Sequence, residues 1–207
     1  MKNKRMIVGF ISQRNNQMSR KRCLIEIIFL SVMLVVVTVL LRFGYCRFMK
    51  AAYPLKFSEL VTSYAEEYGF EPSLVYAVIR TESGFDPQAV SYKKAIGLMQ
   101  ITKDTFDWAQ IRSPEKESLP AERLYDPEIN IHYGIRVLSL LKEEFSDTTT
   151  MLAAYNAGIG NVRRWLKDPA YSDDGVRLKS IPFRETRNYV RKIPSAKWIY
   201  ERLYNIN

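Results

Sequence analysis

Residues 72–85 read PSLVYAVIRTESGF, an apolar run that opens on a proline and closes on a serine, a glycine and a phenylalanine. Val75, Val78 and Ile79 precede Glu82 by seven, four and three positions, which is the spacing of one helix face. Glu82 therefore shares the stripe that should face the core. Desolvation there raises the pKa of a carboxyl group, and a carboxylic acid that stays protonated near neutral pH can act as a general acid. The alternative is a helix-end Glu that turns to solvent or pairs with a base.

Helical periodicity and capping residues around this run predict a mainly α-helical domain. The predicted helices cover residues 57–68, 72–84, 102–108, 127–145, 148–158, 160–166 and 183–203, with Pro194 as a kink or break in the last. Residues 96–101 are short and apolar, and could be strand or helix. Residues 111–126 and 168–180 have the composition of surface loops.

The formal net charge of +9 does not indicate a nucleic-acid-binding protein, because the excess lies at the N-terminus. Residues 1–42 hold eight Lys or Arg and one acidic residue, whereas the other 165 residues carry a net charge of only +2. The apolar run 24–41 follows this basic segment and is interrupted only by Glu26, Ser31 and Thr38. Its 18 residues are at the short end for a transmembrane helix.

The charge asymmetry around this run places the N-terminus in the cytoplasm and the following domain outside. We therefore predict a basic cytoplasmic tail at 1–23, a transmembrane signal anchor at 24–41, a tether at 42–56 and a helical domain at 57–207. A cleaved signal peptide is the alternative. One histidine and two distant cysteines offer no pattern for a metal, so neither metal nor cofactor is expected.

Four blocks of sequence stand out in the domain. They are ESGFDP at 82–87, GLMQ at 97–100, AAYNAG at 153–158 and IPFRETRNYV at 181–190. In this order and spacing they resemble the SLT-domain lytic transglycosylases over about residues 57–205. The resemblance implies a lysozyme-like fold with a groove for peptidoglycan glycan strands. It also implies cleavage between N-acetylmuramic acid and N-acetylglucosamine, with a 1,6-anhydromuramyl end as product.

Such a reaction needs a proton for the leaving oxygen and support for an oxocarbenium-like centre. Glu82 can supply the proton, whereas Asp86, Asp126 and Glu185 are poor candidates for a second catalytic carboxylate. The resemblance implies that the substrate's own N-acetyl group supports the cation. Glu82, once ionised, would then take the proton of the C6 hydroxyl as it attacks C1.

The resemblance also implies substrate-binding roles beside Glu82. Ser83 and Gln100 would hydrogen-bond sugar or acetamido groups, and Met99 would border the same subsite. Two of these residues have a structural alternative. Ser83 could instead terminate the helix, and Met99 could instead pack in the core.

Three residues of the later blocks would complete the site. Tyr155 would bond to the Glu82 carboxyl or sit beside it, Asn156 would hold the loop or a sugar, and Tyr189 would close the far wall. Asn156 could instead satisfy helix-end backbone groups, and Tyr189 could be a core residue.

The chain departs from the family pattern at two places. Lys93-Lys94-Ala95 stands where a small residue usually precedes the alanine, and Thr102-Lys103 stands where Met-Pro is common. Both departures bear on substrate preference, since neither touches the proposed acid. Two other functions stay open: a muramidase that hydrolyses the same bond with water, and a non-catalytic wall-binding scaffold.

Overall fold

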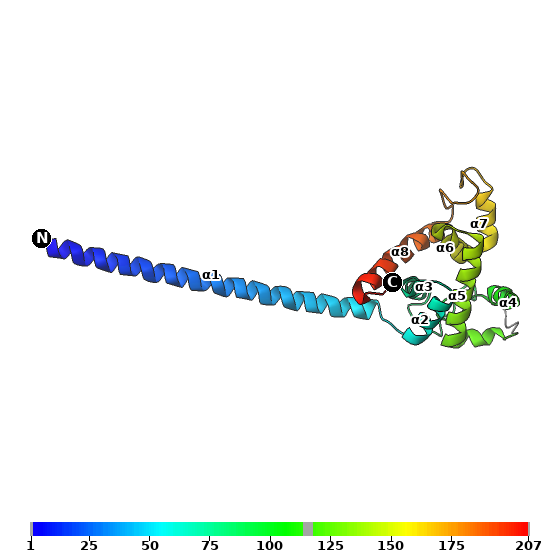
Figure 1. The fold of residues 1–207 in the computed structure, drawn as a ribbon, viewed down its shortest axis with the longest axis horizontal. Helices are drawn as coiled ribbons and strands as arrows, with labels where there is room; N and C mark the ends of the chain where they lie inside the picture. The colour runs from blue at the N-terminus through cyan, green and yellow to red at the C-terminus, as the bar shows by residue number, and fades with distance from the viewer. Residues whose placement is uncertain (1, 114–117, 207) are drawn as a thin grey trace. The chain divides into compact units, whose positions relative to one another are not determined.

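The computed structural model describes residues 2–113 and 118–206, with side chains from residue 22 onward. The chain divides into two units, Met1–Ala52 and Tyr53–Asn207. The first is a single helix, α1 (Lys2–Ala52), whose Arg22–Ala52 part is long and apolar enough to cross a membrane. The prediction of a mainly helical domain after one long apolar helix is confirmed (Figure 1).

Helix α1 continues past the predicted end of the anchor at residue 41. Residues 42–52, which belong to the predicted tether at 42–56, are helical. These residues contain one glycine and no proline, so nothing in them ends the helix. The first such signal is Pro54, which disfavours the helical conformation of the preceding residue, Tyr53. Only residues 53–57 separate α1 from the next helix.

The second unit is built from helices, with two long connections at residues 83–102 and 167–183. The helices are α2 (Ser58–Glu67), α3 (Pro72–Glu82), α4 (Lys103–Ile111), the 3-10 helix η1 (Ala121–Tyr125), α5 (Pro127–Glu144), α6 (Thr148–Ala157), α7 (Ile159–Leu166) and α8 (Arg184–Tyr204). Helix η1 lies inside the predicted loop 111–126, of which residues 114–117 fall outside the described part of the chain.

Capping side chains begin three of these helices where the sequence predicts. Thr102 accepts from the Thr105 N–H, Asp126 from the Glu128 N–H with Pro127 in the first turn, and Asp147 from the Thr150 N–H. Helix α8 runs through Pro194 without ending, so the predicted kink or break does not interrupt it. Its packing against α3 and α6 outweighs the one hydrogen bond that a proline removes.

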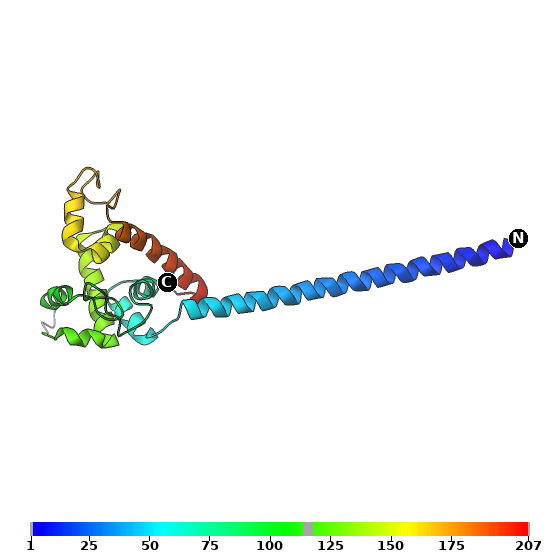
Figure 2. The same ribbon diagram turned by 180° about the vertical axis from the view of Figure 1, so that it is seen from behind.

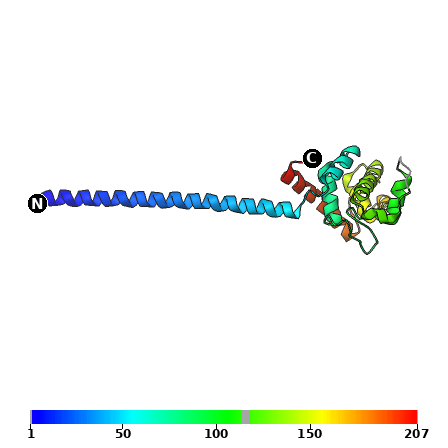
Figure 3. The ribbon, with the colours of Figure 1, turned by 90° about the horizontal axis from the view of Figure 1, so that it is seen from below.

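The helices pack in two groups that share one core. Helix α5 packs against α2, α4, α6 and η1, while α3 packs against α8 and α2 (Figures 1 and 2). Helix α6 joins the groups, because it contacts both α5 and α8. Figure 3 shows the same helices from a third side. Seven consecutive residues of α3, Ser73–Ile79, are buried, so the helix that ends in Glu82 crosses the middle of the core.

Residues 96–101 form neither of the two structures that the sequence allowed. Ile96 and Ile101 exchange two backbone hydrogen bonds of 3.0 and 3.1 Å and enclose a tight turn. Gly97 and Gln100 have positive φ angles of 77° and 50°, so this turn needs a glycine at one position and strains a glutamine at the other. We call residues 96–101 the GLMQ turn.

Candidate active site

Glu82 is the last residue of α3, and the chain reverses immediately after it. Gly84 and Phe85 both have positive φ angles, 63° and 68°, and Phe85 is buried. Gly84 thus ends the helix in the left-handed conformation, as its place in the sequence predicts. The buried run before Glu82 and the reversal after it hold the carboxyl at the edge of the core.

Burial determines the protonation state of Glu82. The residue is only partly accessible, and desolvation raises the pKa of its carboxyl from the ordinary 4.5 to about 7. An interaction with the Tyr189 hydroxyl lowers this pKa, and the charge of Glu185 raises it. Because burial outweighs the other two effects, Glu82 is largely protonated at mildly acidic pH.

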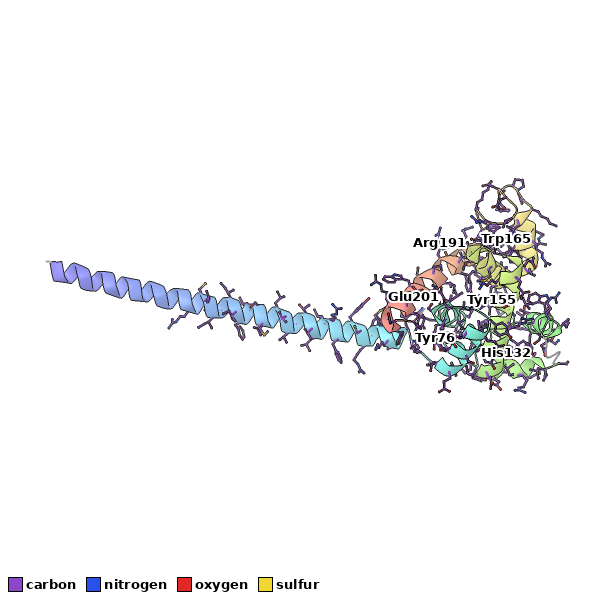
Figure 4. All side chains as sticks on the ribbon, viewed as in Figure 1. Tyr76, His132, Tyr155, Trp165, Arg191 and Glu201 are labelled. Carbon is purple, nitrogen blue, oxygen red and sulfur yellow. The ribbon has the colours of Figure 1, made fainter. Side chains whose placement is uncertain are left out.

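Two tyrosines accompany this acid. Burial and then the negative charge of Glu82 raise the pKa of both Tyr155 and Tyr189 well above the usual value for a phenol. The Tyr189 hydroxyl is buried and makes no hydrogen bond of standard geometry, although it lies near enough to Glu82 to affect its pKa. Helices α6 and α8 thus bring the two hydroxyls to the end of α3, and Figure 4 labels Tyr155 on α6.

The hydroxyl of Tyr155 is engaged with the GLMQ turn. It donates to the Met99 carbonyl at 2.8 Å. Ser83, directly after the acid, donates from its Oγ to the Leu98 carbonyl at 2.8 Å and accepts from the Phe85 N–H at 3.2 Å. The turn is therefore tied to both α3 and α6, on either side of Glu82.

Asn130 on α5 holds the GLMQ turn through hydrogen bonds of its side-chain amide. Its Oδ1 accepts from the Met99 N–H at 2.7 Å, and its Nδ2 donates to the carbonyls of Ile96 at 2.9 Å and Leu124 at 2.7 Å. A Cβ on Gly97 would collide with this amide and with the Leu124 carbonyl. The sequence reasoning missed Asn130. The signal was present, since Asn130, Gly134, Leu138 and Leu141 follow one face of α5.

Met99 has its side chain in the core. That side chain is fully buried and packs on Gly134, where an added Cβ would meet it directly. This is the core packing given above as the structural alternative, and it positions the GLMQ turn. The role of Met99 at the border of a sugar subsite stays a prediction.

The other predicted substrate-binding residues also make contacts within the protein. Gln100 donates from its amide to the carbonyls of Gly97 at 2.9 Å and Ala89 at 3.1 Å. Asn156 accepts from the Thr186 hydroxyl at 2.8 Å and so joins α6 to α8. Both side chains are partly exposed, and both stand on segments that adjoin Glu82 or Tyr189.

Two charged residues mark the rim of the site. Glu185 lies in the first turn of α8, and its charge raises the pKa of Glu82. The pKa of Lys93 is also raised, first by its hydrogen bond with Tyr92 and then by the charge of Glu185. Lys93 is one of the residues at which the sequence departs from the family pattern. The structure thus brings this departure near the acidic residues of the site.

The fold and the site define a helical domain that presents one protonated carboxyl, beside two buried tyrosines, at the end of a core helix. The model of the transglycosylase SLT domain matches residues 59–175. The chain belongs to this family. The match ends before α8, so Tyr189 and Glu185 lie outside the matched residues.

Named relatives agree with this family. Over 163 residues the chain is 34% identical to membrane-bound lytic murein transglycosylase C of Haemophilus influenzae, covering 69% of this chain and 46% of that protein. Soluble lytic murein transglycosylase of Salmonella typhimurium is 35% identical over 151 residues, which are 70% of this chain and 23% of that protein. The chain thus spans about half the length, or less, of these curated relatives.

Solved structures show the same fold. The 70 kDa soluble lytic transglycosylase of Escherichia coli aligns with a TM-score of 0.65 and 30% identity, over 74% of this chain and 25% of that one. An inactive mutant of lytic transglycosylase Slt from Pseudomonas aeruginosa, in which a glutamate is replaced by glutamine, aligns with a TM-score of 0.65 and 33% identity over the same shares.

Proposed function

We propose that this protein is a membrane-anchored lytic transglycosylase of peptidoglycan. In this proposal it cleaves the β-1,4 bond between N-acetylmuramic acid and N-acetylglucosamine and leaves a 1,6-anhydro end. The observation that carries the proposal is the burial of Glu82 at the end of α3, which raises the pKa of its carboxyl to about 7. The relatives' names support the substrate, and the glutamate-to-glutamine mutant titled inactive supports an essential glutamate.

The first step requires a proton on the leaving oxygen. Protonated Glu82 donates it as the glycosidic bond breaks and positive charge develops at C1 of the muramyl sugar. The acetamido oxygen of the same sugar supports that charge. The carboxylate that Glu82 becomes then takes the proton of the C6 hydroxyl while the C6 oxygen bonds to C1. Glu82 ends the cycle protonated, and no water is consumed.

The tyrosines and the GLMQ turn serve this exchange indirectly. The Tyr189 hydroxyl interacts with the ionised form of Glu82 and so stabilises the carboxylate between the two proton transfers. Tyr155, Ser83 and Asn130 hold the GLMQ turn beside the acid. The amides of Gln100 and Asn156 are partly exposed. We propose that their donor and acceptor groups that make no hydrogen bond within the protein contact sugar or acetamido groups.

The proposed location of the protein in the cell follows from helix α1. We propose that α1 crosses the cytoplasmic membrane once with its basic N-terminus inside, which leaves Tyr53–Asn207 on the wall side. The membrane-bound relatives support this arrangement.

The products separate this proposal from its alternatives. Wild-type protein and Glu82→Gln are incubated with purified sacculi, and the released muropeptides are weighed by mass spectrometry. The proposal expects anhydro ends from the wild type and none from Glu82→Gln, with sacculus binding retained by both. Reducing ends that incorporate solvent oxygen would identify a hydrolytic muramidase. Binding without any release by the wild type would identify a scaffold.

A further inference from the structure

A basic pocket opens between α3 and α8, and neither Glu82 nor Tyr189 lines it. Its volume is about 530 Å³, and it is lined by Tyr53, Arg80, Thr81, Arg191, Lys192, Ser195 and Ala196. Three of these seven side chains are cationic, two carry aliphatic hydroxyls and none is acidic. Cations and hydroxyl donors around one cavity suit a phosphate group, which accepts charge-assisted hydrogen bonds. Figure 4 labels Arg191 on the outer side of α8.

Arg80 is held in this pocket by an aromatic neighbour. Its guanidinium carbon lies 3.8 Å from the centroid of the Tyr53 ring, and its charge lowers the otherwise raised pKa of Tyr200. Arg191 and Lys192 are exposed at the pocket rim, one helical turn before Ser195. The pocket thus combines one oriented cation with two that can move toward a ligand.

The pocket includes Tyr53, the residue at which the second unit begins. Tyr53 directly follows Ala52, the last residue of α1. Residues 42–52 lie beyond the apolar run and add about 16 Å of helix, whereas each headgroup layer is about 5–8 Å thick. Tyr53 is therefore held within about two helical turns of the headgroups by the chain itself.

The C-terminal half of α8 is joined to the same point. The Tyr200 and Tyr204 hydroxyls donate to the carbonyls of Pro54 at 3.3 Å and Tyr53 at 2.7 Å. One exposed stripe of α8 follows helical spacing and carries Arg184, Arg187, Arg191, Trp198 and Arg202. Trp198 is 57% exposed, and the Arg202 guanidinium lies 5.3 Å from its ring centroid. Basic residues with an exposed tryptophan are typical of helices that lie on a membrane surface.

We propose that this pocket and the outer stripe of α8 bind the phosphate headgroups of anionic phospholipids in the bilayer that holds α1. The inference rests on the membrane anchoring proposed above and goes beyond it. Bound in this way, the domain rests on the membrane through α8, and Trp198 enters the headgroup region.

Trp198 fluorescence in nanodiscs tests the proposal. The full chain is reconstituted in discs of phosphatidylcholine alone or with about one-third phosphatidylglycerol, each carrying lipids brominated near the interface. Trp198→Phe supplies the background from the other two tryptophans. We expect about threefold stronger quenching of the Trp198 signal in the anionic discs, and a return to the neutral-disc level in the double variant Arg191→Glu/Lys192→Glu.

The matched control is Lys167→Glu/Arg177→Glu, which makes the same change in net charge on exposed residues of α7 and the following loop. It should keep the anionic-disc quenching. Equal loss in both double variants, or equal quenching in neutral and anionic discs, would overturn the proposal. So would a tenfold lower turnover of soluble glycan fragments by Arg191→Glu/Lys192→Glu in neutral discs, since the pocket would then serve the wall polymer.

Failure of the anchor is recognised separately. If alkaline carbonate extracts the wild-type chain from vesicles, the membrane anchoring proposed above is wrong and the lipid site loses its basis. If the chain resists extraction but Trp198 is not quenched, the anchor stands and the lipid site is wrong.

Discussion

The hydroxyl of Tyr155 donates a 2.8 Å hydrogen bond to the backbone carbonyl of Met99, and so connects α6 to the GLMQ turn. The same phenol lies within the electrostatic reach of Glu82, whose charge raises the pKa of Tyr155. The Tyr155 hydroxyl thus donates its hydrogen bond to the turn and not to Glu82. The ring of Tyr155 helps to exclude water from the Glu82 carboxyl. The tyrosine acts on Glu82 mainly by positioning the turn beside it.

Tyr155→Phe should therefore affect stability and activity together. Loss of one part-buried hydrogen bond leaves the Met99 carbonyl unpaired and should cost about 1–2 kcal/mol of unfolding free energy. Looser positioning of the turn should lower kcat by about tenfold. Urea titration and release of soluble muropeptides measure the two effects, with Tyr171→Phe in the 168–180 loop as control. A normal rate in Tyr155→Phe would show that the turn does not depend on this contact.

The pKa of Glu82 predicts the pH dependence of the reaction. The donor must be protonated at the start, so kcat/KM should fall as pH rises through about 7. Glu185→Gln removes a negative charge that raises this pKa, and should move the alkaline limb to lower pH. Initial rates on soluble glycan fragments between pH 5 and 9 measure the limb. An alkaline limb above pH 9 in the wild type would exclude Glu82 as the titrating acid.

The same burial makes Glu82 a source of instability at high pH. Its pKa is higher in the folded chain than in the unfolded one, so the folded state binds the extra proton between about pH 4.5 and 7. The free energy of unfolding that this proton contributes is fully present below that window and is lost as pH rises through it. Glu82→Gln should stabilise the protein by about 3 kcal/mol at pH 8 relative to its effect at pH 4.5. Thermal unfolding at the two pH values tests this, and a pH-independent difference would contradict it.

Asn130→Ala should be among the more damaging single substitutions in the domain. It removes one acceptor and two donor contacts. The Met99 N–H and the Leu124 carbonyl are left without their partner, while the Ile96 carbonyl keeps the hydrogen bond from the Ile101 N–H. We expect a loss of about 3 kcal/mol, together with lower activity. Gln88→Ala, on an exposed residue, is the control. Chemical denaturation measures the difference, and a change within about 0.5 kcal/mol would refute the supporting role.

Gly134 and Gly160 form a matched pair, since both lie in helices. A Cβ on Gly134 would strike the Met99 side chain, whereas one on Gly160 would meet nothing within 4 Å. Gly134→Ala should destabilise by about 1–3 kcal/mol, and Gly160→Ala should be neutral or stabilising by up to about 1 kcal/mol. In the double variant Gly134→Ala/Met99→Ala the clash is relieved, so the two losses should be less than additive. Strict additivity would mean that the two side chains do not meet.

Much of this fold follows from local signals in the sequence. The spacing of Val75, Val78 and Ile79 before Glu82 predicts both the helix and the desolvation of its last residue. Asp126, Asp147 and Thr102 predict where three helices begin, because capping depends on only a few neighbouring residues. The same locality explains why the helix of the anchor continues through residues 42–52 of the predicted tether: without a proline or a capping signal before Pro54, a helix in progress has no reason to end.

The parts that could not be predicted depend on contacts distant in sequence. Nothing local indicates that Met99 would be buried against Gly134, or that Tyr155 would donate to the turn rather than to the acid. The apolar composition of residues 96–101 is compatible with strand or helix, yet Asn130 and Tyr155 supply partners from other helices that favour a tight turn. The roles of Ser83, Gln100, Asn156 and Tyr189 toward a sugar stay predictions, because each is placed at the site through contacts within the protein.

The amide of Asn130 has a consequence for any attempt to redesign this domain. It holds backbone groups from the GLMQ turn and from η1, which are more than twenty residues apart along the chain. Neither segment can be reshaped alone, because a shift of one draws the shared amide away from the other. A reshaped GLMQ turn would therefore require coordinated changes on both segments, and libraries that randomise only this turn would mostly yield unfolded variants.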